Sequence, residues 1–597
     1  MKISQLDRGS MKRVLGLSDL FAIGYGDLGS SIYYALGITA LFALGATPIA
    51  LALAGLVFIC TALTYAEMSA MFHESGGSAS FSRHAFNDLI SFIAGWGLLL
   101  DYIVTIAISA FAVAPYLSYF IPELKQVSIQ IGFTVGLIAI LFFLNLWGAK
   151  QSTRISFALV GFTLLTQLVI IFIGAGWLFN LSEIIHEMRF NAPSLPEFFK
   201  GLAMAMVAYT GIESIAQLAA EAKKPAKNVP RAIIITMFVL VFMYLGLSIV
   251  ALSAMTPQVL STTYLQDPVA GIVAALPFGG SILGPWVGLL AAILLFVAAN
   301  AGVMGASRLA FNMGEYYQLP KMFYKLHSKR RTPYVALFVF CLFASLVVLA
   351  SRGKLEFLAD LYNFGAMLAF FSAHMSLIVM RIKKPDMKRP FRIPFNLRFG
   401  KAHIPVSALL GVLVTAGVWV LVVITKPEGR YLGLAWMGFG LIMYYAYRRY
   451  QKFAVAGSLD IEKIKVPNFK PLSIKHVLVS TRDVGKGEAF QLACELARVH
   501  KAKITALHVL EVPFSLPLDG AMTHRVALAN AVLQQAEAVA REIGVPFELR
   551  LVRARVLSHA ILDELSEKKY DLVVFGKLNA ETEAVLSKSP CPVWICS

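Results

Sequence analysis

The chain has 597 residues, of which 58% are hydrophobic and only 15% charged, and its mean hydropathy is +0.69. Soluble domains are nearer to half apolar and a quarter charged, so this composition excludes an ordinary soluble protein and favours one embedded in a lipid bilayer. The net charge of +18 does not indicate a nucleic-acid partner. Most Lys and Arg residues fall in short loops between apolar segments, where positive charge sets membrane topology.

Twelve apolar segments precede residue 450, and each is long enough to predict a transmembrane helix. Their loops alternate between strongly basic ones and loops nearly free of Lys and Arg. Because basic loops stay in the cytoplasm, an even number of spans predicts a multi-pass cell-membrane protein with both termini cytoplasmic. The segments are roughly 16–43, 47–72, 88–120, 128–148, 155–179, 199–220, 231–255, 281–316, 334–351, 356–381, 404–425 and 431–448.

After Tyr450 apolar strands alternate with amphipathic helices, which is typical of a mainly parallel, doubly wound α/β domain. We therefore expect a membrane domain over 1–450, a linker over 451–470 and an α/β domain over 471–597. The predicted strands are 477–481, 504–511, 547–553, 571–577 and 592–596, and the predicted helices are 488–500, 524–544 and 558–569.

Two spans contain polar interruptions, at 24–37 in the first and at 208–217 in the sixth. Each interruption places glycine beside hydroxyl groups and a carboxylate. Transporters built from inverted repeats bind their substrate near the bilayer midplane, where corresponding helices of the two repeats are broken. A separation of five spans fits a repeat of five plus five helices. The sequence therefore predicts an all-α membrane transporter, without enzymatic activity or a cofactor, that works by alternating access.

Three carboxylates lie deep in the predicted spans: Asp27, Asp101 and Glu213. Such groups are costly inside a membrane, and no deep Lys or Arg lies near them in the sequence. They favour a cationic substrate, bound protons or both. The alternative is that each is protonated or hydrogen-bonded for purely structural reasons. Glu67 and Glu315 lie closer to the cytoplasmic ends of their spans, and we interpret them as structural or gating residues.

A cation that sheds its water shell needs carbonyl, hydroxyl and carboxylate oxygens in its place. Thr105 and Ser109 share a helix face with Asp101, because they follow it by four and eight residues. An amino-acid permease would instead need a free helix N-terminus for the substrate carboxylate, which an acid at that position repels. The oxygen-bearing candidates are Asp27, Ser30, Ser31, Tyr34, Asp101, Tyr102, Thr105, Thr210 and Glu213.

The segment YGDLGSSIYY at 25–34 resembles the signature of KUP-type potassium uptake proteins. LLLDYIVTIAIS at 98–109, TGIE at 210–213 and Tyr362 in LADLYNFG resemble the KimA branch of that family. The whole of 1–450 resembles the wider APC superfamily, which implies a LeuT/APC-type fold with a five-plus-five inverted repeat and twelve helices. The resemblance implies that potassium is bound or gated by Asp27, Tyr34, Asp101, Tyr102, Thr105, Thr210, Glu213 and Tyr362.

The leading hypothesis is a secondary active potassium importer, a K⁺/H⁺ symporter whose partners are potassium, protons and the lipid bilayer. Asp101 and Glu213 would couple the proton. One alternative is a proton-coupled amino-acid permease of the APC superfamily, including one for a cationic amino acid. Another is a nutrient receptor whose transport is vestigial. The expected potassium ligands are Asp27, Tyr34, Asp101 and Thr210.

The segment 474–597 resembles the universal stress protein family, through HVLVST, AKITALHVLE, YDLVVFGK and SPCPVWIC. Nucleotide-binding members carry a glycine-rich stretch followed by a serine after the fourth strand, where backbone N–H groups hold phosphates. Here 575–592 lacks the later glycines, so we do not expect ATP to bind in the usual way. Another nucleotide, such as a cyclic dinucleotide, and a purely dimerising role remain open. A homodimer through this domain is predicted.

Overall fold

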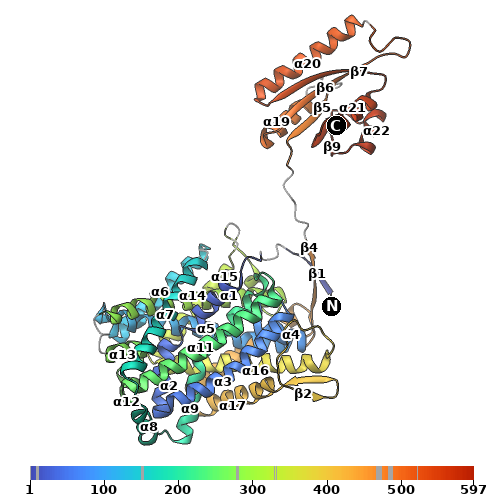
Figure 1. Ribbon diagram of the computed structural model, residues 1–597. Helices are drawn as coiled ribbons and strands as arrows, with labels where there is room; N and C mark the ends of the chain where they lie inside the picture. The colour runs from blue at the N-terminus through green and yellow to red at the C-terminus, as the bar shows by residue number, and fades with distance from the viewer. Residues whose placement is uncertain are drawn as a thin grey trace. The chain divides into compact units, whose positions relative to one another are not determined.

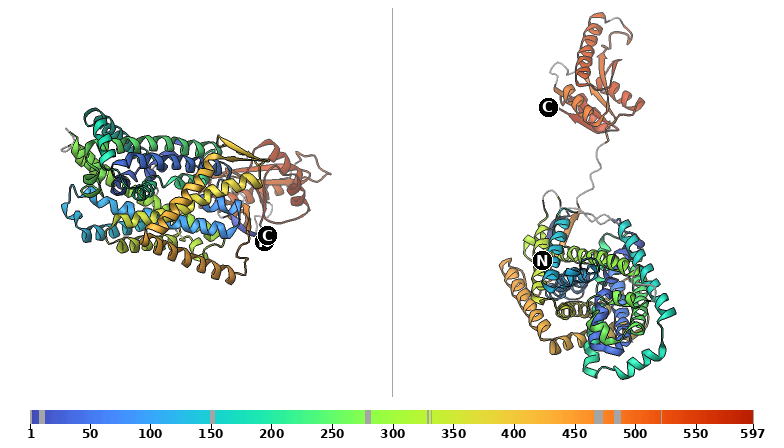
Figure 2. Two further views of the ribbon diagram at one scale, coloured as in Figure 1. Left: turned by 90° about the horizontal axis from the view of Figure 1, so that it is seen from below. Right: turned by 90° about the vertical axis from the view of Figure 1, so that its left-hand side faces the viewer.

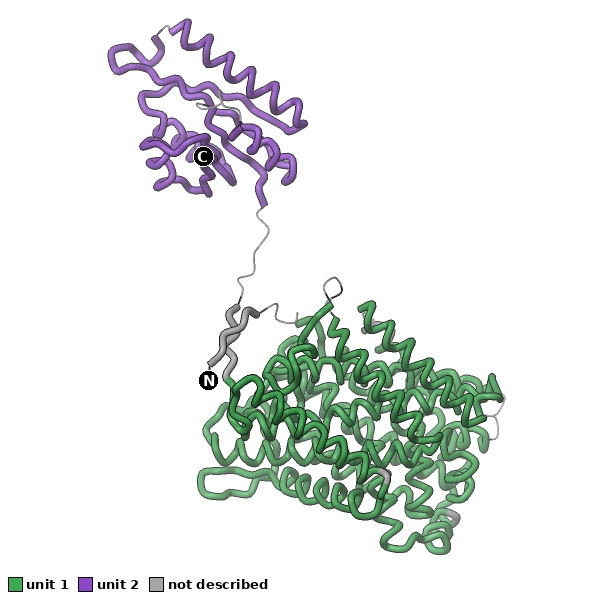
Figure 3. Tube along the Cα trace, turned by 180° about the vertical axis from the view of Figure 1, so that it is seen from behind, with its two compact units in different colours: residues 1–466 green, residues 467–597 purple. Residues whose placement is uncertain are grey.

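The computed structural model divides into two compact units, 1–466 and 467–597, here called unit 1 and unit 2 (Figure 3). Part of the predicted linker, 466–470, lies outside the described residues. The structure describes residues 2–7, 13–148, 153–276, 282–327, 330, 332–465, 473–481, 488–520 and 522–596.

Unit 1 is a bundle of long apolar helices, seen from three sides in Figures 1 and 2. An antiparallel hairpin of β2 (Asn396–Phe399) and β3 (Ala402–Pro405) connects α16 to α17, and β1 (Lys2–Asp7) pairs in parallel with β4 (Asp460–Lys465). The helices are α1 (Leu17–Leu28), α2 (Ile32–Ala43), α3 (Thr47–Met71), α4 (Gly77–Ala85), α5 (Asp88–Leu117), α6 (Val127–Leu146), α7 (Thr153–Trp177), α8 (Leu181–Phe190), α9 (Leu195–Val207), α10 (Ile212–Gln217), α11 (Pro225–Ala254), α12 (Pro257–Thr262), α13 (Pro268–Ala275), α14 (Leu283–Glu315), α15 (Tyr334–Ser351), α16 (Leu355–Lys383), α17 (Val406–Thr425) and α18 (Pro427–Tyr450).

Ten helical segments among the described residues are long and apolar enough to cross a membrane. One of them, Ile32–Met71, has 40 residues and contains both α2 and α3. A single crossing needs only about 20 residues, so this segment is long enough for two. The 24-residue helix α18 is not among the ten. The count of twelve spans and the inverted repeat therefore stay predictions.

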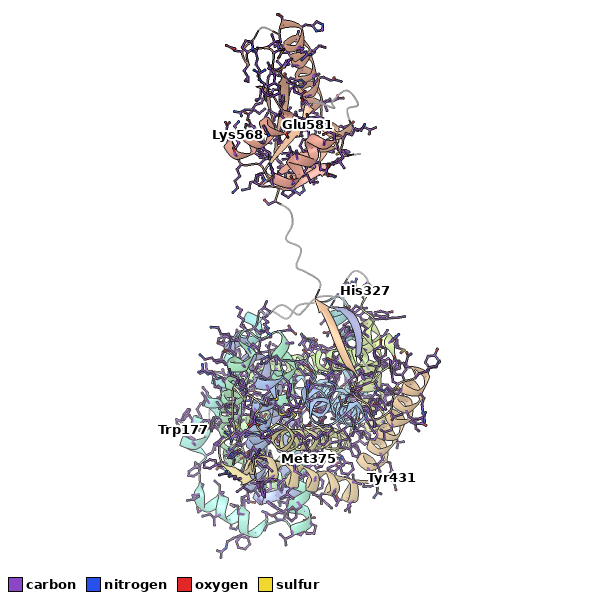
Figure 4. All side chains as sticks on the ribbon, turned by 90° about the vertical axis from the view of Figure 1, so that its right-hand side faces the viewer. Trp177, His327, Met375, Tyr431, Lys568 and Glu581 are labelled. Carbon is purple, nitrogen blue, oxygen red and sulfur yellow. The ribbon has the colours of Figure 1, made fainter. Side chains whose placement is uncertain are left out.

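Helix α5 runs through the interior of unit 1, and its most apolar stretch is completely buried. It packs against α4, α14, α15 and α16. Only 28% of the apolar stretch of α6 and of α17 is instead buried, as expected for helices that face lipid. The exposed aromatic side chains of Trp177 and Tyr431, at helix ends, point out from opposite sides of unit 1 in Figure 4. The central position of α5 places Asp101 inside the bundle.

Unit 2 is a parallel five-stranded sheet with the strand order β7-β6-β5-β8-β9. Apolar residues of α19 and α20 cover one face, and those of α21 and α22 cover the other, so the sheet is doubly wound as predicted. Its strands are β5 (His476–Ser480), β6 (Lys503–Glu511), β7 (Phe547–Ala554), β8 (Leu572–Phe575) and β9 (Val593–Ile595), and its helices are α19 (Glu488–His500), α20 (Thr523–Ile543), α21 (Leu557–Glu567) and α22 (Ala580–Lys588).

Helix α22 was missing from the predicted elements. The Asn579 side chain caps it, accepting hydrogen bonds from the backbone N–H groups of Glu581 and Thr582 at 3.1 and 2.9 Å. An asparagine at this position is a known helix start signal, because its side-chain oxygen satisfies backbone donors that the helix leaves free. The stretch after β8 therefore begins a capped helix.

Candidate substrate and ion site

The first polar interruption is a tight turn between α1 and α2. Gly29 and Ser31 keep right-handed helical angles, with φ of −66° and −65°. The Leu28 carbonyl accepts a hydrogen bond from Tyr244 Oη at 2.5 Å, and the Asp27 carbonyl accepts one from Ser30 Oγ at 2.6 Å. The sequence predicted an opened backbone here. Instead, Gly29 and Ser31 stay in the helical region, and protein hydroxyl groups already bond the carbonyls of Asp27 and Leu28.

The second interruption, between α9 and α10, breaks the helix fully. Gly211 has a φ of +111°, a left-handed conformation that L-residues with side chains rarely adopt. The Thr210 hydroxyl donates to the Val207 carbonyl at 2.9 Å, and the Ser214 hydroxyl donates to the Gly211 carbonyl at 2.7 Å. Thr210 thus caps the end of α9, and α10 begins after Gly211 with Glu213 in its first turn.

The two interruptions lie against each other. A Cβ atom added to Gly211 would lie 3.3 Å from Asp27 Oδ2, closer than most side chains tolerate. The Asp27 carboxylate interacts electrostatically with Glu213 and lies close to the Ser214 hydroxyl. The sixth span therefore brings its acidic side chain next to that of the first.

Asp101 completes a cluster of three carboxylates with Asp27 and Glu213, here called the carboxylate cluster. Asp101 interacts most strongly with Glu213 and less strongly with Asp27. Neither carboxylate oxygen of Asp101 has a hydrogen-bond partner among the described residues, so the contact between Asp101 and Glu213 is electrostatic. Asp27, Asp101 and Glu213 are 6%, 0% and 1% exposed.

Hydroxyl groups surround the carboxylate cluster. Tyr34, Tyr102 and Tyr362 are fully or almost fully buried, and each interacts electrostatically with the cluster. Thr105 Oγ1 lies 2.9 Å from Tyr362 Oη and 2.9 Å from the Asp101 carbonyl oxygen. These side chains come from α2, α5 and α16, which are far apart in the sequence, so the fold collects them around one point.

The remaining predicted hydroxyl, Ser31, forms a pair with Tyr34 at 3.1 Å between oxygens.

Sequence reasoning missed two further contributors to the site. Tyr65 of α3 interacts electrostatically with Glu213 and Asp101 of the cluster. Gly77 brings the start of α4 close to Glu213, because a Cβ at this glycine would lie 3.9 Å from the Glu213 Cβ. The glycine-rich run at 75–80 was the available signal for this contact.

No member of the carboxylate cluster forms a salt bridge within the described ranges. The Glu213 carboxylate instead interacts electrostatically with the backbone N–H groups of Gly211 and of Glu213 itself, at the start of α10, and its Oε2 atom has no hydrogen-bond partner among the described residues. Free N–H groups at a helix start attract anions. Here the side chain of the protein itself occupies that position.

Glu67 belongs to a different contact, near the end of α3. Arg381 donates to Glu67 Oε2 at 2.6 Å, and the Ile393 backbone N–H donates to the same oxygen at 3.0 Å. Arg389 Nε lies 3.3 Å from Glu67 Oε1. These contacts tie α3 to the end of α16 and to the loop that follows it, as a structural or gating residue would. Glu315 is the half-buried last residue of α14.

Interrupted apolar helices that enclose buried acidic and hydroxyl groups are typical of a multi-pass membrane transporter. The chain belongs to the amino acid permease family, whose sequence profile matches residues 15–444, and it carries a C-terminal universal stress protein domain, matched over 473–597. It is 28% identical over 477 residues to the branched-chain amino acid permease BcaP of Bacillus subtilis, covering 74% of this chain and 94% of that one.

Two other similarities complete the comparison. The methylthioribose transporter of Bacillus subtilis is 29% identical over 473 residues, covering 74% of this chain and 94% of the relative. The structure of a universal stress protein from Archaeoglobus fulgidus covers 20% of this chain and 92% of its own, with 19% identity and a TM-score of 0.18. The relatives favour the amino-acid permease alternative over the potassium importer that the sequence signature suggested.

Proposed function

We propose that the chain is a proton-coupled amino-acid permease of the cell membrane, with both termini cytoplasmic, and that it prefers amino acids with a net positive charge. The family and the relative named as a branched-chain amino acid permease support the substrate class. The carboxylate cluster supports the preference for positively charged substrates. Its three buried acids have no salt-bridge partner among the described residues, so they favour a cation between them.

Proton coupling follows from the same cluster. Three carboxylates this close repel one another when all are ionised, so protons or a cationic substrate must neutralise them. When Glu213 is protonated, it no longer competes as an anion for the backbone N–H groups of Gly211 and Glu213. Those groups can then bind the substrate carboxylate, as helix starts do in broken-helix transporters. The substrate ammonium would lie beside Asp27 and Asp101.

The test is uptake by the purified full chain in proteoliposomes with an inward proton gradient. We expect labelled lysine or arginine to accumulate at least about tenfold faster than labelled leucine, a difference of about 1.4 kcal/mol in transition-state binding. Dissipating the proton gradient should abolish accumulation. Equal uptake of leucine would remove the charge preference, and no amino-acid uptake by correctly inserted protein would contradict the permease.

A second candidate function is K⁺/H⁺ symport, and one observation favours it. The carboxylate cluster is ringed by the hydroxyl groups of Tyr34, Tyr102 and Tyr362, and oxygen ligands of this kind replace the water of a monovalent cation. Uptake of labelled rubidium into the same proteoliposomes distinguishes potassium transport from amino-acid transport. Potassium-inhibited rubidium uptake without amino-acid uptake would favour the symporter.

Unit 2 is proposed to regulate transport, through a nucleotide such as a cyclic dinucleotide or through pairing with a second copy. The loop 482–487 after β5 lies outside the described residues. Ending the chain after residue 466, the last residue of unit 1, tests whether unit 1 transports without unit 2. We expect the uptake rate at saturating substrate to stay within about twofold of the full chain. Complete loss of uptake in a well-inserted truncated protein would show that unit 2 is required for transport itself.

A further inference from the structure

A cavity of about 300 Å³ lies between the end of α16 and the β2–β3 hairpin. It is separate from the carboxylate cluster and shares no residue with it. Figure 1 shows the hairpin extending from the bundle next to the end of α16. We call this cavity the basic pocket, and its lining residues are Arg381, Pro385, Asp386, Met387, Arg389, Arg392, Lys401 and His403.

The basic pocket carries more positive than negative charge. Its four Arg and Lys side chains face two carboxylates, Asp386 in the lining and Glu67 behind it. Glu67 is shared between Arg381 and Arg389. Arg392 and Lys401 form no salt bridge within the described part of the chain. An excess of two positive charges in a concave site is suited to an anion.

Two further observations concern the inner guanidinium groups of the pocket, which Glu67 and, for Arg389, backbone carbonyl groups hold in place. Arg381 is only 2% exposed, and its Nε atom has no hydrogen-bond partner among the described residues. Burial and then the neighbouring guanidinium groups of Arg381 and Arg392 lower the pKa of Arg389, despite the opposing effect of Glu67. Like charges are therefore crowded around Arg389, and the carboxylate of Glu67 does not offset them completely. Guanidinium groups in such a cluster bind phosphate oxygens with several donors at once.

The surroundings of the basic pocket point to the membrane surface. Phe395, Leu397 and Phe399 of the hairpin segment are 84%, 46% and 58% exposed, although all three are large and apolar. Apolar side chains exposed beside Lys and Arg are typical of segments that lie in the headgroup region of a bilayer. The pocket also follows the basic loop 381–392, which the charge pattern places on the cytoplasmic side, where anionic lipids concentrate.

We propose that the basic pocket binds the phosphate group of an anionic phospholipid headgroup, with Arg392 and Lys401 as its exposed ligands. Arg381 and Arg389 form the inner wall and stay held by Glu67. A bound headgroup would join the end of α16 to the hairpin and so to α17, because the lining residues come from both segments. This proposal does not depend on the transported substrate.

The test compares the full chain with a pocket variant, Arg392→Gln with Lys401→Gln, and a matched control, Lys388→Gln with Arg398→Gln. Both variants remove two exposed positive charges from the same segment, but only the first removes pocket-lining residues. Native mass spectrometry measures retained lipid after titration with phosphatidylglycerol or phosphatidylcholine. We expect wild type and control to retain phosphatidylglycerol selectively and the pocket variant to bind it about tenfold more weakly.

A second measurement with inorganic phosphate alone distinguishes a lipid ligand of the basic pocket from a soluble phosphate ligand. If phosphate raises the melting temperature of the wild type but not of the pocket variant, while phosphatidylglycerol is not selected, the phosphate site stands and its natural ligand is soluble. If neither probe separates the wild type from the pocket variant, or if the control loses as much binding as the pocket variant, the proposal is overturned.

Discussion

Replacing Glu213 with Gln should lower proton-driven uptake by on the order of 100-fold and remove its dependence on pH, because Gln cannot exchange a proton. Glu213 is 1% exposed and interacts electrostatically with Asp27, with Asp101 and with the N–H groups at the start of α10. Gln has nearly the same shape, so the fold around it should survive. The measurement is the initial rate of uptake between about pH 5 and pH 8 in proteoliposomes.

The sign of the pH effect follows from the role of the proton. Wild-type uptake should rise as the external pH falls, because the proton is a co-substrate and protonated Glu213 frees the backbone donors. The introduced glutamine side chain resembles the protonated state at every pH, so the remaining uptake should be flat. Glu187→Gln is the matched control, since Glu187 is also buried, at 4% exposure, and bonds Asn191 away from the cluster. A wild-type pH profile in Glu213→Gln would exclude this residue as the coupling group.

Replacing Asp88 with Ala should destabilise unit 1 by about 3–5 kcal/mol, because it leaves a buried guanidinium without its carboxylate. Arg448 donates to Asp88 Oδ2 at 3.0 Å, and the Leu459 backbone N–H donates to the same oxygen at 3.0 Å. Arg448 also donates to the Ala454 carbonyl at 2.8 Å. The pair joins the start of α5, the end of α18 and the segment that follows it. Loss of folded protein after heating in detergent measures the effect.

A double variant separates the unpaired charge from other effects of the substitution. Asp88→Leu with Arg448→Met removes both charges and keeps apolar bulk, so it should be clearly more stable than Asp88→Ala alone. Glu537→Ala is the exposed control, because its pair with Arg541 lies on the surface of α20 and should contribute less than about 1 kcal/mol. If the double variant is no more stable than Asp88→Ala, the buried charge is not the cause.

Local sequence patterns predicted unit 2 well. The five strands alternate with helices at nearly the predicted positions, because the inward side chains of a covered parallel sheet form short apolar runs that are visible in the sequence. Helix α22 was missed for a local reason as well. The helix has only nine residues and is weakly amphipathic, so its clearest signal in the sequence is the capping residue Asn579.

The interruptions of unit 1 were predicted in position but not in form. Both segments carry glycine and hydroxyl residues, yet only Gly211 adopts a left-handed conformation. Gly29 remains helical, and the hydroxyl groups of Ser30 and Tyr244 bond the carbonyls of its turn. Tyr244 lies 216 residues from Leu28 in the sequence. No local pattern could show that this tyrosine closes the first interruption.

The sequence by itself determined membrane residence, the α/β character of unit 2, the two polar interruptions and the three deep acids, since each depends on composition or spacing within one segment. Only the tertiary structure decided which groups meet. Glu67 bonds Arg381 across 314 positions, and Asp88 bonds Arg448 across 360. Asp27, Asp101 and Glu213 form one cluster for the same reason. Helix packing decides which residues become partners. Burying a charge costs free energy, and a polar group on the neighbouring helix at the same depth reduces that cost.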